Sequence, residues 1–442
     1  MLNIEITIRF ILFLIITYHA NIMVLFETAC NLSFLASVRD LSHRLESFLI
    51  SCCCSVKFKF MKMKVLIVCN NVHMRGNGVS TAVRSLMQRL ADEGIDVRLA
   101  ACKNPDKNGM QPDYPLEHFR FPIFEPIISS NGFMFARIDK DMLTRAVAWA
   151  DVIHIMEAFP LESAVVEIAE RLGKPCIGSY HTFTENITAN LGISKSTFIN
   201  KLITRWWKNS VYDHCTCIQC PTDKVREHLE ENGYASRLEV ISNGIVISEE
   251  SFQQKEPGYP PYLIICIGRF AKEKSQDTLL EAMRYSRHAK EIKLLFAGKG
   301  PKMKTYLHEA QKLIEDHVIT YEPVFGFYDS ETLKDLTRQS YLYIHCADVE
   351  VEGLSCLEAI KEGVVPVIAQ SKMSATSQFA LDERSLFPAH DSKALAERID
   401  WWIEHPSERR EMGRRYAEST KSYDINKSTE RIIRMYREAL KS

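Results

Sequence analysis

The chain has 442 residues, of which 46% are hydrophobic and 25% are charged, and its formal net charge is −1 at pH 7. This length exceeds what one ordinary hydrophobic core supports, so we expect two domains of about 180 residues each. The average composition excludes a mainly disordered chain, and the balanced charge excludes a global attraction to nucleic acid. Nothing in the composition sets the oligomeric state.

Residues 1–60 differ from the rest of the chain. The segment Phe10–Ile16 opens an uncharged run that continues to Phe26 and is short and polar for a membrane span. Three interpretations stay open, in decreasing order of preference: a start codon placed too early, a membrane-associating extension, and a signal peptide.

Residues 61–245 alternate predicted strands with predicted helices, which is typical of a doubly wound parallel sheet. The strands are expected at residues 64–68, 96–102, 152–156, 176–179 and 214–220. A loop with Gly76 and Gly78 precedes a helix predicted over 80–93, which Ser80 or Thr81 would cap. The two glycines would let the backbone approach a ligand closely, although ordinary turn chemistry explains them about as well.

The cysteines and one acidic pair raise the question of a metal. Cys215, Cys217 and Cys220 lie close together, but a second ligand pair at zinc-site spacing does not accompany them, so a structural role is favoured. Asp139 and Asp141 open a predicted helix and are interpreted as acids that favour its N-terminus. We therefore expect no metal and no other obligatory cofactor.

A basic and aromatic segment follows the fourth predicted strand. Apolar residues recur at helical spacing among cations, and no acidic residue occurs between Glu185 and Asp213. One interpretation is a helix packed on its own domain, with its lysines in water. The favoured one is an interfacial helix, with tryptophans at the lipid headgroups and cations on anionic phosphates. Its residues would be Lys195, Lys201, Arg205, Trp206, Trp207 and Lys208.

Residues 246–261, rich in Glu, Gln, Gly and Pro, are predicted to be a linker to a second doubly wound domain over 262–422. Residues 423–442 are predicted to form a C-terminal helix that can pack back on the first domain. Strands of the second domain are expected at residues 264–270, 293–298, 318–324 and 341–346. Each of these strands is followed by Gly, Arg, Lys or Glu. Because the carboxyl ends of parallel strands lie at one edge of a sheet, we expect these residues to meet around a ligand there.

Glu350 and Glu358 are the most informative pair in this second domain. Gly353 and Leu354 lie between them, where a loop is predicted to enter a helix. Two carboxylates beside free backbone N–H groups at a helix start suit a ligand with many hydroxyls and a diphosphate, such as a nucleotide sugar. Alternatively, the glutamates face solvent or compensate the helix dipole.

Four ordered motifs, Ser242–Ile245, Gly268–Phe270 with Lys274, Ala297–Pro301 and Glu350 to Glu358, resemble the retaining family 4 glycosyltransferases of the GT-B fold. The resemblance runs from about Met63 to the C-terminus. It implies an α/β protein with two Rossmann-like, doubly wound parallel-sheet domains facing each other across a cleft. It also implies a diphosphate clamp of Arg269 and Lys274, with Glu350 on the donor sugar, Glu358 on the ribose and the backbone of Gly353 and Leu354 on the phosphates. The remaining donor-binding residues would be Gly76, Gly78, Gly268, Gly298 and Lys299. Glu352 stands where this family usually has an aromatic residue.

His181 falls at the carboxyl end of a predicted strand and matches the family histidine beside the donor sugar. A single histidine is more often structural, but its position favours a catalytic role together with Arg269, Lys274 and Glu350. The following Glu185 and Asn186 resemble the acceptor-side segment of members that glycosylate diacylglycerol, although Phe183–Thr184 replaces the Gln-Pro common there.

The resemblance and the basic-aromatic segment together predict a retaining, metal-independent hexosyltransferase. It would move a hexose from a UDP-sugar to a membrane lipid acceptor that is diacylglycerol- or ceramide-like. It would be cytoplasmic and peripheral, on the inner face of the cell membrane. Three alternatives stay open: a same-fold transferase for polysaccharide or polyprenyl-linked glycan assembly, a nucleotide-sugar epimerase, and a nucleotide-sugar-binding module without turnover.

Overall fold

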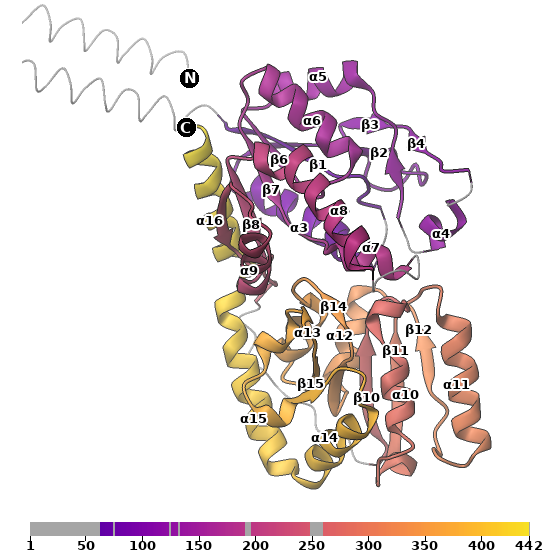
Figure 1. Cartoon of the computed structure of the whole chain (residues 1–442). Helices are drawn as coiled ribbons and strands as arrows, with labels where there is room; N and C mark the ends of the chain where they lie inside the picture. Colours follow the sequence, from indigo (N-terminus) through magenta and orange to yellow (C-terminus); the bar gives the residue numbers. More distant parts are fainter. Residues whose placement is uncertain are drawn as a thin grey trace, which may run out of the picture. The chain divides into compact units, whose positions relative to one another are not determined.

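The computed structural model describes residues 62–73, 76–122, 125–130, 133–190, 196–247 and 260–441. The extension of residues 1–60, Lys195 and most of the predicted linker lie outside the described residues. Residues 63–442 form one compact unit that contains two α/β domains (Figure 1). Among the described residues, no helix combines the length and the apolar character needed to cross a membrane.

The amino-terminal domain is built on a parallel sheet with the strand order β3-β2-β1-β6-β7-β8-β9. Its central strands read as short apolar runs and are almost entirely buried, as expected where helices cover both faces of a parallel sheet. The strands are β1 (Lys64–Val68), β2 (Asp96–Cys102), β3 (Tyr114–Leu116), β6 (Val152–Ile155), β7 (Cys176–Ser179), β8 (Cys217–Cys220) and β9 (Arg237–Val240). A small antiparallel pair, β4 (His118–Phe119) and β5 (Phe135–Ala136), accompanies the sheet.

The helices of this domain are α3 (Gly78–Asp92), α4 (Glu125–Ser130), α5 (Lys140–Trp149), α6 (Pro160–Arg171), α7 (Thr184–Asn190), α8 (Thr197–Ser210) and α9 (Asp223–Glu231). The predicted cap of the first helix is wrong by one turn. Asn77, not Ser80 or Thr81, caps α3, because its side chain accepts hydrogen bonds from the N–H groups of Val79 and Ser80. Ser80 is instead buried and donates to the carbonyl of Asn71.

The carboxyl-terminal domain has a second parallel sheet with the order β12-β11-β10-β13-β15-β17. The strands are β10 (Tyr262–Ile267), β11 (Ile292–Ala297), β12 (Val324–Gly326), β13 (Leu342–His345), β15 (Val365–Gln370) and β17 (Leu386–Pro388), and β14 (Val349–Glu350) pairs with β16 (Met373–Ser374). The two doubly wound domains confirm the predicted fold class.

The strand predicted over residues 318–324 is wrong, because β12 begins only at Val324. His317 adopts a left-handed conformation with φ 55°, and the N–H groups of Val318 and Ile319 return to the carbonyl of Leu313. These apolar residues therefore close the C-terminus of α11 (Met303–Glu315), a common helix ending that uses the same residue types as a strand.

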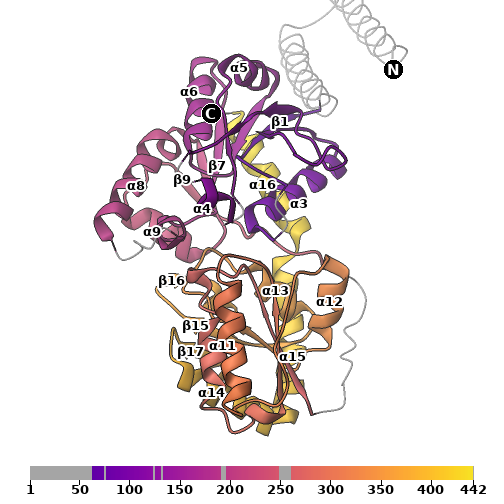
Figure 2. The ribbon, with the colours of Figure 1, turned by 90° about the vertical axis from the view of Figure 1, so that its right-hand side faces the viewer.

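The other helices of this domain are α10 (Asp277–Ala282), α12 (Ser330–Arg338), α13 (Leu354–Lys361), α14 (Ser392–Glu404) and α15 (Pro406–Ser419), with the short 3₁₀ turns η2 (Lys272–Lys274) and η6 (Thr420–Tyr423). The last helix, α16 (Ile425–Ala439), returns to the amino-terminal domain, where it contacts α3, β7 and β8 (Figure 2). Its apolar residues Ile432, Ile433 and Tyr436 join the core that contains Val65 and Ile67 of β1.

The chain thus passes between the domains twice, and the two passages pair with each other. The Ile245 N–H donates to the Tyr423 carbonyl at 2.8 Å, and the Ile425 N–H donates to the Ile245 carbonyl at 3.0 Å. Gly244, with φ 72°, lies against this second passage, because a Cβ built on it would be 2.6 Å from the Cα of Ile425. We call residues 242–245 the outgoing crossing and residues 423–425 the return crossing.

Candidate active site

The carboxyl ends of β10 and β11 meet at two glycines. A Cβ built on Gly298 would lie 1.9 Å from the carbonyl oxygen of Gly268, so only glycine permits this approach. Arg269 follows directly, and its guanidinium pairs with Glu273, whose side chain is only 1% exposed. This buried carboxylate orients the guanidinium at the sheet edge, where a developing negative charge can be met.

Lys274 and Glu350 form an ion pair at the same edge, with side chains 18% and 20% exposed. Burial alone would raise the pKa of Glu350. The positive charges of Lys274 and Arg269 outweigh that effect and hold the pKa below its ordinary value. Glu350 is therefore ionised at neutral pH and can accept hydrogen bonds from hydroxyl groups.

His345, the last residue of β13, lies beside the Glu350 carboxylate. Its Nε2 lies 3.6 Å from the Glu350 carboxylate and 3.1 Å from the Thr376 hydroxyl, and its Nδ1 lies 3.0 Å from the Tyr343 hydroxyl. Burial lowers the pKa of His345 to about 4, so the ring is neutral at physiological pH. A neutral ring with a partner on each nitrogen fixes the side chains around Glu350 without adding a charge.

The start of α13 provides backbone donors beside these side chains. Gly353 precedes the helix with φ 93°, and a Cβ there would lie 2.5 Å from the Thr376 hydroxyl oxygen. The turn therefore requires glycine, and it leaves the first N–H groups of the helix, beginning at Leu354, for an anion. Glu358, one turn further along, is exposed and open to a ligand.

His181 lies on the amino-terminal side, just beyond β7. Its Nε2 is buried and has no hydrogen-bond partner among the described residues. Burial lowers the pKa of His181 to about 4, so the imidazole is neutral. A buried ring nitrogen without a partner is costly, which is expected where a ligand completes the site. The helix α7 begins three residues later and contacts η2, the turn that carries Lys274.

The glycine loop before α3 also reaches the second domain. Gly76 has φ 82°, and a Cβ built on it would lie 3.1 Å from the ring of Phe327. The ammonium of Lys299 lies 4.5 Å from the centre of that ring. Gly76 and Lys299 thus share one aromatic neighbour, whereas Gly78 is already the first residue of α3.

Glu185 and Asn186 serve local structure. The Glu185 carboxylate accepts a hydrogen bond from Asn200 of α8 at 3.1 Å, and the Asn186 side chain accepts one from the Phe183 N–H at 3.0 Å. Both residues remain partly exposed. They connect α7 to its surroundings, and their predicted acceptor contacts stay a prediction.

The interfacial role predicted for Trp207 and Lys208 is wrong in detail. Trp207 is 2% exposed and packs edge-on against Phe159 and Tyr180, with ring centres 6.1 Å apart in both cases. Lys208 pairs with Asp213 at 2.6 Å, which neutralises its charge. Consecutive residues on a helix point about 100° apart, so one of two adjacent tryptophans faces the core while Trp206, 39% exposed, faces outward.

This difference predicts opposite effects of two neighbouring substitutions. Trp207→Ala should destabilise the amino-terminal domain by about 3–5 kcal/mol, because it leaves a cavity among aromatic rings. Trp206→Ala should change stability by no more than about 0.5 kcal/mol, as is usual for surface positions. Urea unfolding followed by circular dichroism measures both. Equal losses of stability would contradict the assignment of these side chains to the core and the surface.

The acidic pair and the cysteines that raised the question of a metal have structural roles. Asp139 caps α5 by accepting a hydrogen bond from the Met142 N–H at 2.9 Å, as the helix interpretation predicted. Cys215, Cys217 and Cys220 are all buried free thiols. Among the described residues, no group of three or more His, Cys, Asp or Glu side chains is placed to hold a metal ion.

Three residues that support the site were not predicted as functional: Glu273, His345 and Thr376. Arg269 and Glu273 are only four residues apart, so their ion pair is a local contact that the sequence could have suggested. His345 ends a buried strand, which is also visible in the sequence. Thr376 has no such signal, since its place against Gly353 depends on a contact between distant segments.

Each half of the chain matches a model of a known protein family. Residues 76–249 match the family model "Glycosyltransferase Family 4", and residues 247–419 match "Glycosyl transferases group 1". An alpha-monoglucosyldiacylglycerol synthase of Streptococcus pneumoniae is 24% identical over 307 residues, which is 66% of this chain and 68% of that protein.

Two solved structures illustrate the similarity further. The catalytic domain of cholesterol-alpha-glucosyltransferase from Helicobacter pylori is 44% identical over 37% of this chain and 100% of that one, with a TM-score of 0.33. Anabaena HepE in complex with UDP-glucose is 13% identical, with a TM-score of 0.65 over 85% of this chain and 100% of that one, and shows the shared fold. The chain therefore belongs to the GT-B glycosyltransferases, with a family 4 domain followed by a group 1 domain.

Proposed function

We propose that the protein is a retaining hexosyltransferase that moves a hexose from a UDP-sugar to a membrane lipid. One observation carries the catalytic part. Arg269, Lys274 and Glu350 gather at one sheet edge, and the turn that holds Lys274 contacts α7, the helix that follows His181. These charged groups would bind the donor, and the contact between the two elements brings their edge towards the segment of His181, whose buried Nε2 has no hydrogen-bond partner among the described residues.

The chemistry of these groups suits departure of a nucleoside diphosphate. Arg269 and Lys274 would stabilise the negative charge that develops on the leaving UDP, and the start of α13 would add backbone N–H groups. Glu350, ionised at neutral pH, would accept hydrogen bonds from donor-sugar hydroxyls. The acceptor hydroxyl would attack from the face that UDP leaves, and a donor phosphate oxygen would take its proton. The anomeric configuration would then be retained without a protein nucleophile.

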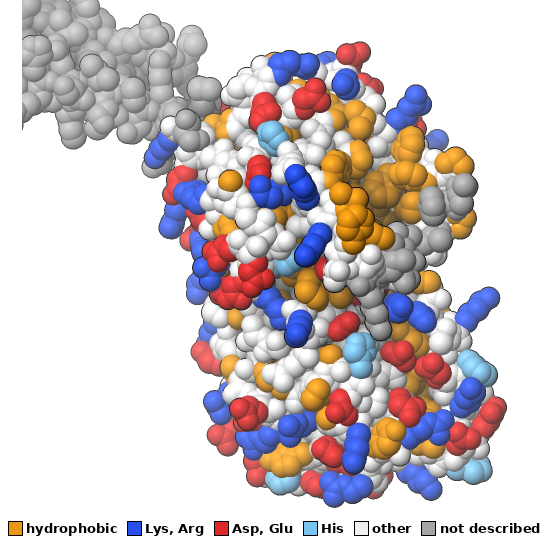
Figure 3. Space-filling view, in the orientation of Figure 1, with side chains coloured by type: hydrophobic (Ala, Val, Ile, Leu, Met, Phe, Trp, Pro, Cys, Tyr) orange, Lys and Arg blue, Asp and Glu red, His pale blue; other side chains and the backbone are white. Residues whose placement is uncertain are grey.

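The outer face of α8 supports a lipid acceptor. Phe198, Leu202 and Trp206 are 76%, 59% and 39% exposed and recur every four residues, so they form one apolar stripe. Lys201 and Arg205 are exposed beside it. Figure 3 shows hydrophobic side chains gathered over the region where Figure 1 places α7 and α8, with Lys and Arg side chains nearby. Apolar groups next to cations suit an anionic bilayer surface.

A transfer assay tests the proposal. The protein would be incubated with radiolabelled UDP-glucose or UDP-galactose and anionic vesicles that contain diacylglycerol, ceramide or cholesterol, with acceptor-free vesicles as the control. We expect label in a lipid product with one donor and one acceptor, and proton NMR should show the α-anomer from an α-linked donor. Absence of label from all of these lipids would overturn the lipid acceptor, and a β-linked product would overturn retention.

Chelation tests the proposed independence from metal. Because Arg269, Lys274 and the start of α13 would supply the positive charge at the diphosphate, we expect activity in EDTA to stay within about threefold of the untreated value. Modest loss would fit magnesium helping product release. Complete loss of activity in EDTA, with recovery on addition of manganese, would contradict the proposal and favour a metal-assisted mechanism.

A further inference from the structure

Glu352 is a buried carboxylate in residues 351–353, the loop between β14 and α13, which we call the donor loop, and it joins this loop to the outgoing crossing. It precedes Gly353 and is 3% exposed. Its carboxylate accepts hydrogen bonds from the Ser242 hydroxyl, from the Asn243 N–H at 3.2 Å and from the Asn243 side-chain amide at 2.6 Å. Each of these donors belongs to the segment that leaves the amino-terminal domain.

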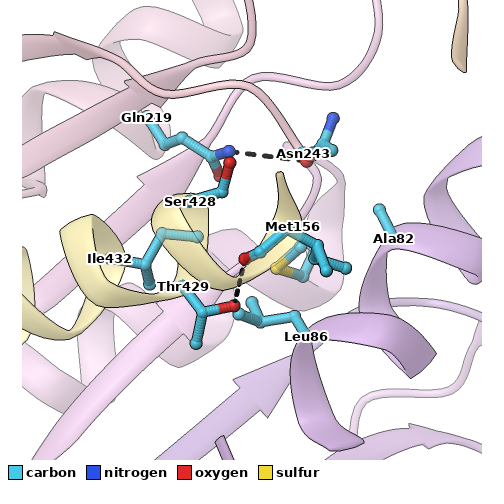
Figure 4. A pocket seen from close by; sticks show the side chains of 9 residues that line it. Ala82, Leu86, Met156, Gln219, Asn243, Ser428, Thr429 and Ile432 are labelled. Carbon is cyan, nitrogen blue, oxygen red and sulfur yellow. Dashed lines mark hydrogen bonds between the residues drawn. The ribbon is translucent and has the colours of Figure 1, made fainter. Parts of the chain in front are cut away.

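Asn243 continues this connection into the amino-terminal sheet. The Gln219 amide donates to the Asn243 side-chain oxygen at 3.4 Å (Figure 4) and to the Ile241 carbonyl at 2.8 Å. The Ser179 hydroxyl donates to Gln219 at 2.5 Å and lies 2.7 Å from the His154 ring. The donor loop is thus tied through buried side chains to three adjacent strands, β8, β7 and β6.

The chain of hydrogen bonds ends on the returning helix. The other nitrogen of His154 lies 2.7 Å from the hydroxyl of Tyr436 in α16. Gln219 and Asn243 also line a small cavity of about 10 Å³ with Ser428 and Thr429 of that helix (Figure 4). Such a volume holds about one water molecule, so it is no ligand site. The outgoing crossing and α16, the helix that follows the return crossing, therefore contact the same group of buried polar side chains.

We propose that Glu352 is a positioning residue for donor binding, because it holds the Gly353–Leu354 turn in register with the outgoing crossing. This inference rests on the proposed function, in which the backbone of that turn meets the donor phosphates. A shift of Gly353 would move the first N–H groups of α13 away from the diphosphate. The family usually has an aromatic residue at this position. Glu352 would thus hold the turn by hydrogen bonds where other members would hold it by packing.

Ionisation of Glu352 gives the role a pH signature. Burial, with a smaller contribution in the same direction from the charge of Glu350, raises the pKa of Glu352 to about 7, although the hydrogen bonds from Ser242 and Asn243 lower it. Glu350 in β14 and Tyr423 in η6 are the titratable groups that interact with it. The ionised carboxylate accepts from all its donors, whereas a protonated one presents a hydrogen to them. Donor binding should therefore weaken as pH falls through about 7.

The first experiment compares Glu352→Gln with Asp400→Asn by calorimetric binding of UDP-glucose, whose diphosphate does not titrate near neutral pH. Asp400 is a matched control, since it is a buried carboxylate that accepts from the Ser286 hydroxyl and the Arg287 N–H, in α14 of the same domain. We expect about tenfold weaker binding for Glu352→Gln, as for the loss of a hydrogen bond to a charged group. Binding by that variant should be independent of pH between 6 and 8, whereas Asp400→Asn should bind as the unaltered protein does.

A second experiment exchanges the charge. Asn243→Asp alone places two carboxylates together and should weaken UDP-glucose binding more than Glu352→Gln does. The double variant restores an amide–carboxylate pair in the opposite direction, so we expect it to recover most of the lost affinity. Thermal unfolding of each variant shows whether it is folded. Recovery of binding separates positioning from a general loss of stability.

The outcomes distinguish this inference from the proposed function. If the unaltered protein binds neither UDP-glucose nor UDP-galactose, the proposed donor is wrong. If it binds, but folded Glu352→Gln binds equally well with the same pH dependence, the positioning role is overturned. The same conclusion follows if the double variant binds no better than the weaker single variant.

Discussion

Replacing Lys274 with alanine is expected to lower turnover by about 10²–10³-fold, the loss typical of removing one group that stabilises charge in a transition state. Lys274 pairs with Glu350 and lies in the turn that contacts α7. In the proposed mechanism, its loss would remove a positive charge from beside the leaving diphosphate. It also removes the partner that keeps the pKa of Glu350 low, so the acid limb of the pH–rate profile should move to higher pH. Arg269→Ala should act similarly on turnover.

Lys272→Ala is the matched control, because Lys272 lies in the same turn and its side chain is exposed. It should retain turnover within about twofold, since removing one exposed charge near a site changes energies little. Steady-state kinetics with the donor varied measure all three variants. Near-normal turnover in both Lys274→Ala and Arg269→Ala would sink the proposed clamp. A loss in Lys272→Ala equal to theirs would show only a general effect of charge.

The proposed membrane binding should weaken strongly when the apolar stripe of α8 is made polar. A Phe198→Ser, Leu202→Ser, Trp206→Ser variant loses side chains that each contribute about 1.5–3 kcal/mol at full burial. Because insertion at a headgroup region is partial, we expect at least about a 10²-fold fall in partitioning to anionic vesicles. Lys201→Gln with Arg205→Gln should weaken partitioning by about 1 kcal/mol per charge and remove its dependence on salt.

Vesicle sedimentation measures these effects, and UDP binding in solution shows that the active site is intact. A control with Lys304→Gln and Leu307→Ser changes an exposed cation and an exposed apolar residue on α11, in the other domain, and should bind vesicles normally. Equal sedimentation of the α8 variant and the unaltered protein, or none by either, would defeat the interfacial proposal. A soluble acceptor would then be favoured.

The alternation of strands and helices was readable from local patterns. The residues 64–68 and 96–102 predicted as strands are β1 and β2 with the same limits. β1 and the second half of β2 are short, buried, apolar runs, as is usual for parallel strands. The grouping of Arg269, Lys274 and Glu350 was also accessible, since strand ends of one parallel sheet share an edge. The strand predicted from Val318 failed because a helix ending and a strand can use the same apolar residues.

By itself, the sequence determined the two doubly wound domains, the motif positions and the amphipathic character of α8. These follow from residue type, spacing and local propensity. Only the tertiary structure decided that Trp207 belongs to the core while Trp206 is exposed, and that Asp213 neutralises Lys208. It also decided that Glu352 meets Ser242 and Asn243, more than a hundred positions away. Such contacts depend on how segments distant in the sequence pack together. The residue pattern of one segment does not identify the segment that it will contact.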